Sequence, residues 1–359
     1  MELKECLNMT WHKYLWSEWQ IVNEIGSGAY GTVYKIRRED ASGVYFAALK
    51  VITVSVKDEH ISVSLKDSKA HDLQEENDNL KKNTNVEMDK SQLKDADANS
   101  KVDYFCFAEE ISKEISFMEK FKGNSNIVSY EDHRIAFDEE SNCWVILLRM
   151  ELLTSLAEYF GNEDRSEKDV VRLGIDICNA LEMCEKEGIL HRDVKPGNIF
   201  VSDFGNFKLG DFGIAFITHN TRTMREPIGT HDYMAPEVVR DKIYNRTVDL
   251  YSLGLIMYRI LNDGNAPFLP VDGVVTNQMR KEADLRRMNG EPLPKIEGIP
   301  QGLQTILLKA CSYQPEDRFQ TAHEMRSVLK NYARELEAIE RIKQKASMNL
   351  YFSAAGDLD

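Results

Sequence analysis

The sequence lacks any arrangement of cysteines that holds a metal or builds a disulfide framework. Its six cysteines include no C-x-x-C pair, and no histidine cluster accompanies them. This pattern excludes the common structural zinc motifs. Cys178 and Cys184 lie within a helical pattern of apolar residues, so we expect small core residues with reduced thiols, as in a cytoplasmic protein.

Long apolar runs and an excess of positive charge are also missing. No stretch of about 18 apolar residues exists, and residues 1–5 lack the charged-then-apolar pattern of a signal peptide. No membrane span is therefore expected. The formal net charge of -14 argues against a nucleic-acid partner, because binding a duplex requires a basic face.

Glycine and proline are absent from residues 54–105, where apolar side chains are also sparse. This stretch is too long for an ordinary loop, and its composition is typical of disorder. We expect an insertion that serves as a solvated spacer. A regulatory segment that binds an unknown partner is the alternative.

One polar stretch organises the rest of the chain: His191-Arg192-Asp193-Val194-Lys195-Pro196-Gly197-Asn198. Two short apolar runs follow it, at 199–201 and 207–209, around a turn rich in Asp, Gly and Asn. This pattern predicts a β-hairpin. Because a hairpin brings its two ends together, Asp211 is expected beside Asn198 and Asp193.

The residue types in this hairpin suggest metal and proton chemistry. Carboxylate and amide oxygens are the ligands that Mg²⁺ prefers, and a further Asp can orient and deprotonate a hydroxyl. Asp-Phe-Gly occurs twice, at Asp203 and at Asp211. The first lies at the predicted hairpin tip, so only Asp211 is expected to reach the metal.

A glycine cluster precedes these elements and reads Ile25-Gly26-Ser27-Gly28-Ala29-Tyr30-Gly31-Thr32-Val33. Its G-x-G-x-x-G-x-V spacing, with strand patterns on both sides, lets backbone amides approach a phosphate. A plain tight hairpin explains the cluster equally well. In the next expected strand, 46–52, Lys50 stands among apolar residues, where an ordinary edge position is the simpler explanation.

Together these stretches resemble the eukaryotic-type (Hanks-type) serine/threonine protein kinases, most of all their bacterial members. The resemblance covers roughly residues 19–53 and 106–332 and includes Ala235-Pro236-Glu237, which resembles the end of an activation segment. It implies an α+β, two-lobed fold, with a small β-rich N-lobe and a larger helical C-lobe. ATP and Mg²⁺, with Mn²⁺ possible, are the implied cofactors, and proteins carrying Ser or Thr are the implied substrates.

The resemblance also implies a role for each matching residue. Asp193 would deprotonate the substrate hydroxyl, and Lys195 would stabilise the transferring phosphoryl group. Lys50 would position the phosphates and pair with Glu114, although Glu109, Glu110 and Glu119 rival Glu114 on charge alone. The metal ligands would be Asn198 and Asp211. The nucleotide-binding residues would be Ile25, Gly26, Ser27, Gly28, Gly31, Val33, Ala48, Lys50, Met150, Glu151, Leu153, Phe200 and Asp211.

Two supporting interactions and a domain organisation follow from the same resemblance. Asp249 would hold the catalytic loop, and Arg318 would pair with Glu237. We expect an N-terminal extension over residues 1–18, an N-lobe over 19–153, a C-lobe over 154–332, and a C-terminal helix and tail over 333–359. The terminal helix pattern itself covers 322–346, and we expect residues 353–359 to be frayed.

Two other functions compete with an active kinase. A pseudokinase scaffold would lack a catalytic residue, yet every member of the phosphoryl-transfer set is present. A small-molecule phosphotransferase would be expected to lack Lys195 and the Ala-Pro-Glu segment. Both of these features are present in the sequence.

Overall fold

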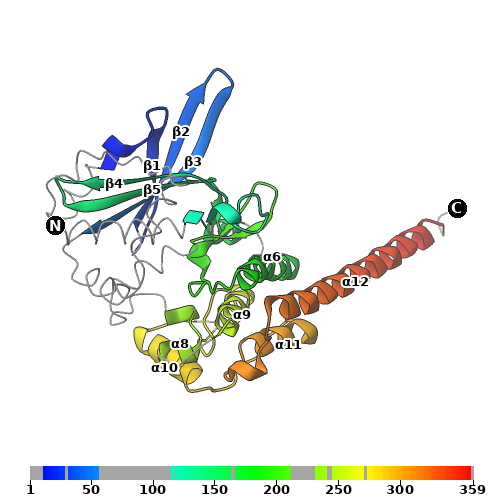
Figure 1. The fold of residues 1–359 in the computed structure, drawn as a ribbon. Coiled ribbons are helices and arrows are strands. Elements are labelled where there is room, and N and C mark those ends of the chain that lie inside the picture. Colours follow the sequence, from blue (N-terminus) through cyan, green and yellow to red (C-terminus); the bar gives the residue numbers. More distant parts are fainter. Residues whose placement is uncertain are drawn as a thin grey trace. The chain divides into compact units, whose positions relative to one another are not determined.

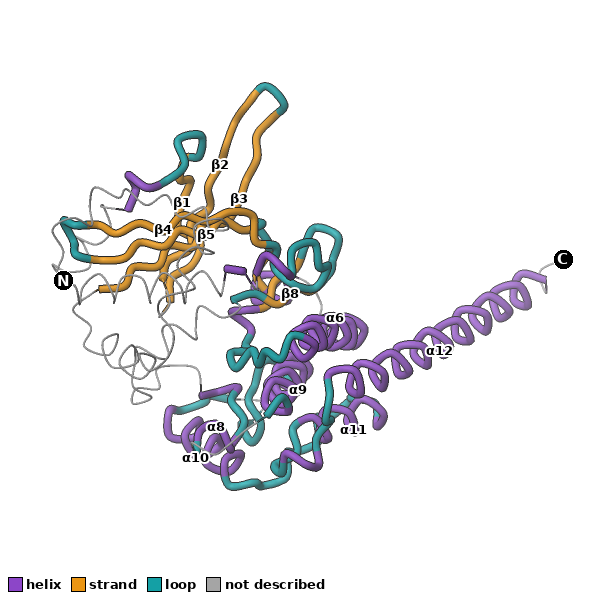
Figure 2. The backbone as a smooth tube through the Cα atoms, viewed as in Figure 1, coloured by secondary structure: helices purple, strands orange, loops and turns teal. Residues whose placement is uncertain are grey.

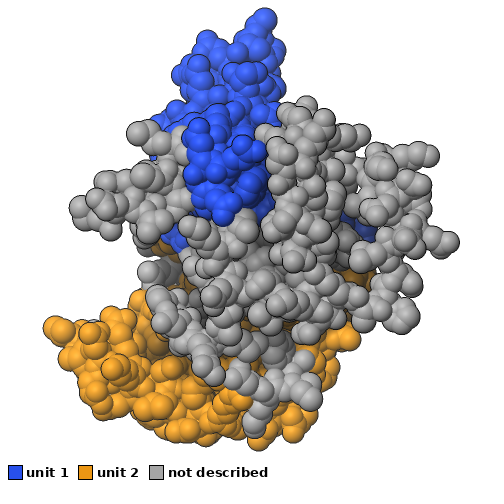
Figure 3. Space-filling model, turned by 60° about the vertical axis from the view of Figure 1, so that its left-hand side comes forward, with its two compact units in different colours: residues 1–153, 210–227 blue, residues 154–209, 228–359 orange. Residues whose placement is uncertain are grey.

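The computed structural model describes residues 11–28, 31–55, 115–116, 118–162, 166–211, 231–240, 245–270 and 273–356. The chain divides into two compact units (Figure 3). The first unit comprises residues 1–153 and 210–227, and the second comprises 154–209 and 228–359. The predicted insertion beyond Ser55 lies outside the described residues.

An antiparallel sheet of five strands forms most of the first unit (Figure 1). Its strands are β1 (Gln20–Gly28), β2 (Gly31–Asp40), β3 (Gly43–Ser55), β4 (Tyr130–Asp138) and β5 (Cys143–Met150), in the order β1-β2-β3-β5-β4. The expected insertion start at residue 54 is wrong, because β3 continues to Ser55, which pairs with Cys143. β-Branched Val51, Ile52 and Val54 favour this longer strand.

One face of this sheet carries an aromatic cluster. Trp11 and Trp19 pack there with Ile36, Leu49 and Leu147. Trp11 is only 2% exposed and belongs to a short helix, η1 (Trp11–Tyr14). Residues 11–14 of the expected N-terminal extension therefore form a short helix that packs on the sheet of the first unit.

A half-buried ion pair connects this short helix to β4. Lys13 donates to the carboxylate of Asp138, whose side chain is fully buried, and Ser141 donates to the same carboxylate. Burial opposes ionisation of Asp138, but these hydrogen bonds prevail and lower its pKa to about 2. The carboxylate therefore stays charged at neutral pH and holds the N-terminal segment in place.

The opposite face of the sheet is aliphatic and receives a helix. Ile52, Ile146 and Leu148 project from β3 and β5, and Ile115 packs on them together with Met118. Side chains alternate between faces along a strand. Lys50, two residues before Ile52, therefore shares the face that Ile115 and Met118 cover.

The second unit is mostly helical (Figure 2). Its small sheet, in the order β6-β7-β8, contains β6 (Thr154–Ser155), β7 (Ile199–Val201) and β8 (Phe207–Leu209). Its helices are α5 (Leu156–Asn162), α6 (Glu167–Lys186), η2 (Pro196–Asn198), η3 (His231–Tyr233), α8 (Pro236–Val239), α9 (Thr247–Leu261), α10 (Asn277–Met288), α11 (Gln301–Ala310), η4 (Pro315–Asp317) and α12 (Ala322–Gly356).

Helices α6 and α9 form the centre of this unit. Ser166 caps α6 by accepting a hydrogen bond from the backbone N–H of Asp169. Cys178 and Cys184 are buried along α6, as predicted, and burial raises the pKa of the Cys178 thiol. Nearly all of α9 is buried, so it is a core helix rather than a surface one.

The terminal helix is longer than the sequence pattern indicated. Helix α12 continues to Gly356, ten residues beyond the expected end, so the prediction of a frayed segment from Ser353 is wrong for residues 353–356. No glycine or proline interrupts the sequence before Gly356, and Ala, Met and Leu are good helix formers. The expected boundary at residues 332/333 therefore falls inside one continuous helix.

Both units together give the α+β fold that the sequence predicted, with a β-rich unit before a mainly helical one. Among the helices of the described residues, none is long and apolar enough to cross a membrane.

Replacing Trp11 by Ala should destabilise the first unit by about 3–5 kcal/mol, because the indole is almost fully buried against the sheet. Phe204→Ala is the matched control, since Phe204 is 92% exposed in the β7–β8 turn and should change stability by less than about 0.5 kcal/mol. Urea unfolding followed by circular dichroism measures both. Equal losses in the two variants would contradict the role assigned to Trp11.

Candidate active site

Asp193 lies in a loop before the β7–β8 hairpin and is only 7% exposed. Lys195 places its Nζ atom 2.6 Å from Asp193 Oδ2. The Asn198 amide donates to the same oxygen at 2.9 Å and to the backbone carbonyl of Asp193 at 2.8 Å. One carboxylate is thus oriented by an ammonium and an amide, which is the geometry required of a base that meets a hydroxyl.

A buried carboxylate in α9 holds the backbone of this loop. Asp249 accepts the N–H of His191 at 2.9 Å and that of Arg192 at 2.8 Å. Burial raises the pKa of Asp249, while His191 and the two amides oppose this effect. The expectation that Asp249 holds the catalytic loop is confirmed.

The anchored loop contains backbone strain. Arg192 has φ of 64°, a left-handed conformation that a non-glycine residue adopts only at a cost of about 1–2 kcal/mol. The hydrogen bond from its N–H to Asp249 holds it there. This conformation sets the direction in which the next residue, Asp193, leaves the loop.

The β7–β8 hairpin has the predicted form. Ile199 pairs with Leu209 and Val201 with Phe207, and exposed Asp203 lies in the turn between the strands. Asp176 of α6 accepts the N–H of Phe207 at 3.0 Å and fixes the second strand. Phe200 lies in β7, opposite Ser155 of β6.

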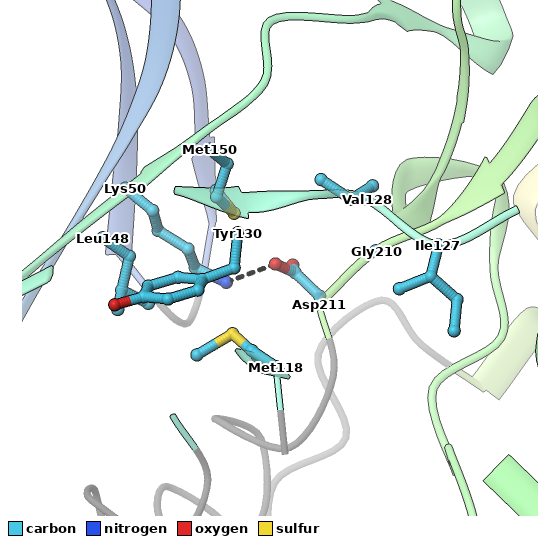
Figure 4. A pocket seen from close by; sticks show the side chains of 9 residues that line it. All are labelled: Lys50, Met118, Ile127, Val128, Tyr130, Leu148, Met150, Gly210 and Asp211. Carbon is cyan, nitrogen blue, oxygen red and sulfur yellow. Dashed lines mark hydrogen bonds and ion pairs between the residues drawn. The ribbon is translucent and has the colours of Figure 1, made fainter. Parts of the chain in front are cut away.

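In the first unit, Lys50 is buried within β3 rather than placed at an edge. Its Nζ atom lies 2.7 Å from Asp211 Oδ1, and its side chain is 6% exposed. Figure 4 shows this ion pair in a small cavity that Met118, Leu148 and Met150 also line. Asp211 has φ of 59°, another left-handed residue at the site.

The sheet residues that we expect to bind the nucleotide share one face. Val33 lies opposite Lys50 on β2, and Ala48 lies opposite Met150 on β5. Directly opposed residues of an antiparallel pair project from the same face. Val33, Ala48, Lys50 and Met150 therefore project from the same face of the sheet, although they come from three strands.

The glycines of the β1–β2 hairpin differ in their surroundings. Gly31 has φ of 124°, and an added Cβ would lie 2.2 Å from the carbonyl oxygen of Val51, so only glycine fits. An added Cβ at Gly26 or Gly28 would meet no described atom within 4 Å. The backbone of these two glycines, unlike that of Gly31, borders open space. Ser27 and Ile25 are exposed on the same strand.

The chain after β5 is held by Glu151. Its N–H donates to the Ser129 carbonyl at 3.1 Å, and its carboxylate accepts the Ser129 N–H at 2.5 Å. The N–H of Glu151 is therefore already engaged within the first unit. Leu153, half-buried, is the last residue of the first unit before Thr154.

The structure leaves part of the predicted site as a prediction. Glu114, the expected partner of Lys50, lies outside the described residues, as do Phe212 and the threonines of the expected activation segment. Asn198 and Asp211, the expected metal ligands, belong to different units. Phe200 also belongs to the second unit, whereas the other expected nucleotide-binding residues belong to the first.

A buried ion pair supports the segment after residue 230. Arg318 donates to both carboxylate oxygens of Glu237, at 2.6 and 2.8 Å, and to the carbonyls of Ser312 and Tyr313. The Arg318 side chain has no exposed area. The expected pairing of these residues is confirmed.

Sequence reasoning missed several supporting residues. Ser252 of α9 donates to the Tyr233 carbonyl at 2.8 Å, and Arg287 of α10 donates to the Met234 carbonyl at 2.7 Å. Arg287 is 5% exposed. Its place one residue before the end of a charged helix carries no sequence signal of burial.

The arrangement of loop, hairpin and buried ion pairs is that of a protein kinase domain. The family model described as "Protein kinase domain" matches residues 78–330, well over half of the chain. The chain therefore belongs to the protein kinase domain family. Residues 20–55, with the glycine-rich hairpin and Lys50, precede the matched region, so their assignment rests on the geometry of the sheet.

Curated relatives are bacterial. Serine/threonine-protein kinase PknB of Mycobacterium tuberculosis is 34% identical over 200 residues, which cover 53% of this chain and 31% of that protein. A probable serine/threonine-protein kinase of Clostridium perfringens is 32% identical over 198 residues, 53% of this chain and 26% of that protein. The chain thus spans less than a third of the length of these relatives.

Glu237→Gln should destabilise the second unit by about 3–5 kcal/mol, because it leaves the charge of Arg318 buried without its carboxylate partner. The double variant Glu237→Met/Arg318→Met should lose less free energy of unfolding than Glu237→Gln alone, since no charged side chain remains buried at this site. Urea unfolding of the three proteins measures this difference.

The matched control for this experiment is Arg286→Ala. Arg286 also forms a two-pronged pair, with Glu291, but its side chain is 48% exposed. Its removal should cost less than about 1 kcal/mol. A double variant less stable than Glu237→Gln would contradict the explanation from buried charge.

Proposed function

We propose that this chain is an ATP-dependent serine/threonine protein kinase that transfers a phosphoryl group to hydroxyl groups of protein substrates. The observation that carries the proposal is the oriented carboxylate of Asp193, set between Lys195 and Asn198 on a loop that Asp249 anchors. Membership of the protein kinase domain family adds independent support.

Asp193 is the group proposed to act on the acceptor. Its Oδ2 atom accepts from both Lys195 and Asn198, so the carboxylate is held in one orientation. A substrate hydroxyl that donates to this carboxylate is oriented for attack and can pass its proton to it. Lys195, two residues further on, carries the positive charge suited to the transferred group.

The first unit fits a nucleotide. Gly26 and Gly28 border open space, so their backbone can approach phosphates closely. Lys50 supplies a buried positive charge, and Val33, Ala48 and Met150 supply an apolar wall on the same face. Bound ATP would supply the phosphoryl group, with a divalent metal that balances its charge.

Asn198 and Asp211 are proposed as the ligands of that metal, and Mg²⁺ is the ion that suits their oxygens best. Each comes from one end of the β7–β8 hairpin: Asn198 directly precedes Ile199, and Asp211 follows two residues after Leu209. The pairing of Ile199 with Leu209 supports the proposal that the two flanks of this hairpin supply both donors.

Serine and threonine are the proposed acceptors. Lys195 stands two residues after Asp193, in the form of the loop typical of serine/threonine kinases, and the relatives found here carry that name. A pseudokinase is the rival function. It is disfavoured because Asp193, Lys195, Asn198, Lys50 and Asp211 all keep functional side chains.

Asp193→Asn should lower the rate of phosphoryl transfer to a generic protein substrate by about 1,000-fold or more, since the amide cannot accept the hydroxyl proton. ATP affinity should change by less than about threefold, because Asp193 is proposed to act on the acceptor and not on the nucleotide. Transfer of labelled phosphate and titration with a fluorescent ATP analogue measure the two quantities. Near-normal turnover would refute the assignment.

Asp211→Asn should remove metal-dependent transfer and weaken the contact with Lys50. Asp203→Asn changes the other Asp-Phe-Gly in the same way, but Asp203 is exposed in the hairpin turn and should leave transfer unchanged. A titration of activity against Mg²⁺ compares the two variants. The opposite ranking would show that the wrong Asp-Phe-Gly has been assigned to the metal.

A further inference from the structure

A cavity of about 70 Å³ lies in the second unit between the end of α9 and helix α10. It is far smaller than the roughly 300–1,000 Å³ of pockets that hold whole small molecules. A carboxylate or a phosphate group would fit, whereas a nucleotide would not. Three arginines line it, Arg259, Arg280 and Arg287, against two aspartates, Asp232 and Asp284.

Arg287 forms the fixed wall of this cavity. It is 5% exposed and donates to the Met234 carbonyl at 2.7 Å and to Asp284 Oδ1 at 2.6 Å. The charge of Asp284 is therefore paired with Arg287. Arg259 and Arg280 carry the remaining positive charges of the lining, against the single charge of Asp232.

Arg259 contacts two neighbouring side chains, but one of its hydrogen-bond donors has no partner among the described residues. Its guanidinium lies 4.7 Å above the centre of the Tyr233 ring. The nearest carboxylate, Asp232 Oδ2, lies 3.6 Å from the guanidinium, and the Asp232 side chain is 65% exposed. Within the described residues, the buried Nε atom of Arg259 has no hydrogen-bond partner. A buried donor without an acceptor is costly, so a bound anion would offset that cost.

Arg280 completes the site from the first turns of α10. It is exposed, and among the residues that the structure describes no hydrogen bond or ion pair of its side chain is present. Asp284, one helical turn further on and also in the cavity lining, pairs with Arg287 instead. An arginine with five N–H donors is well suited to bind a carboxylate or a phosphate.

The cavity lies within reach of the catalytic loop inside the same unit. Arg259 and Asp249 both belong to α9, ten residues apart, which is about 15 Å along the helix. Asp249 holds the backbone next to Asp193. An extended peptide covers about 3.3–3.6 Å per residue, so about five residues span this distance.

We propose that this arginine-lined cavity is a substrate subsite for an anionic side chain that lies within about five residues of the phosphorylated Ser or Thr. The inference rests on the proposed kinase function. The anion is the carboxylate of Asp or Glu, or the phosphate of a residue modified beforehand. The chain as a whole has a net charge of -14 and would repel such a peptide, so a local cationic site is required.

The test uses peptides with one acceptor Ser, in which Asp, phosphoserine or Ala occupies each of the five positions on either side. For the full chain, one position should favour an anion over Ala by about tenfold in kcat/KM and in affinity measured by fluorescence anisotropy. The Asp and phosphoserine peptides distinguish the two sources of negative charge.

Arg280→Gln and Arg259→Gln should each bring this anion-to-Ala ratio close to one. Lys281→Gln is the matched control. It removes the same charge from an exposed position next to Arg280 that does not line the cavity, and it should keep the ratio. Thermal unfolding of each variant shows whether the fold is retained, and Arg280→Gln, at an exposed site, should melt as the parent does.

Two results would overturn the subsite: no anion preference at any position in the parent protein, or a preference that survives Arg280→Gln. Absence of transfer to every peptide would instead overturn the proposed function. The ratio of the affinities for the anionic and Ala peptides would still decide whether the cavity binds an anionic side chain, because fluorescence anisotropy measures binding without turnover.

Discussion

The buried carboxylate of Asp249 is the constraint on which the catalytic loop depends. It accepts two consecutive backbone N–H groups, from His191 and Arg192, and keeps Arg192 at a positive φ. A helix that is buried along nearly its whole length is a rigid support for such a contact. These tertiary hydrogen bonds therefore set the conformation of the loop, and the loop sets the orientation of Asp193.

The sheet of the first unit has two chemically different faces. One face is sealed by tryptophans and the short helix η1. The other holds Lys50, Val33, Ala48 and Met150 together with aliphatic residues that Ile115 and Met118 cover. The period of two along each strand makes this separation possible, since a shift of one residue would move Lys50 to the sealed face.

Charge is distributed unevenly in this acidic chain. The buried ammonium of Lys50 and the arginines beside α10 are the local positive sites on which the proposed function and substrate subsite rest. Arg318 shows that burial of an arginine need not imply binding, because Glu237 and two carbonyls give each of its three nitrogens a hydrogen-bond partner. Arg259 differs in that its buried Nε lacks a partner among the described residues.

The sequence by itself determined the family, the α+β class, the β7–β8 hairpin and the pairings of Asp249 and Arg318. The hairpin follows from a local pattern that a sequence displays directly, whereas the fold class and the two pairings follow from the resemblance of its motifs to those of the protein kinases. The tertiary structure alone decided that β3 extends to Ser55, that α12 extends to Gly356, and that Arg259, Arg280 and Arg287 share one cavity. The reason is physical. A strand end depends on the partner strand that pairs with it, and a cavity depends on residues that are distant in sequence and meet only after the helices have packed.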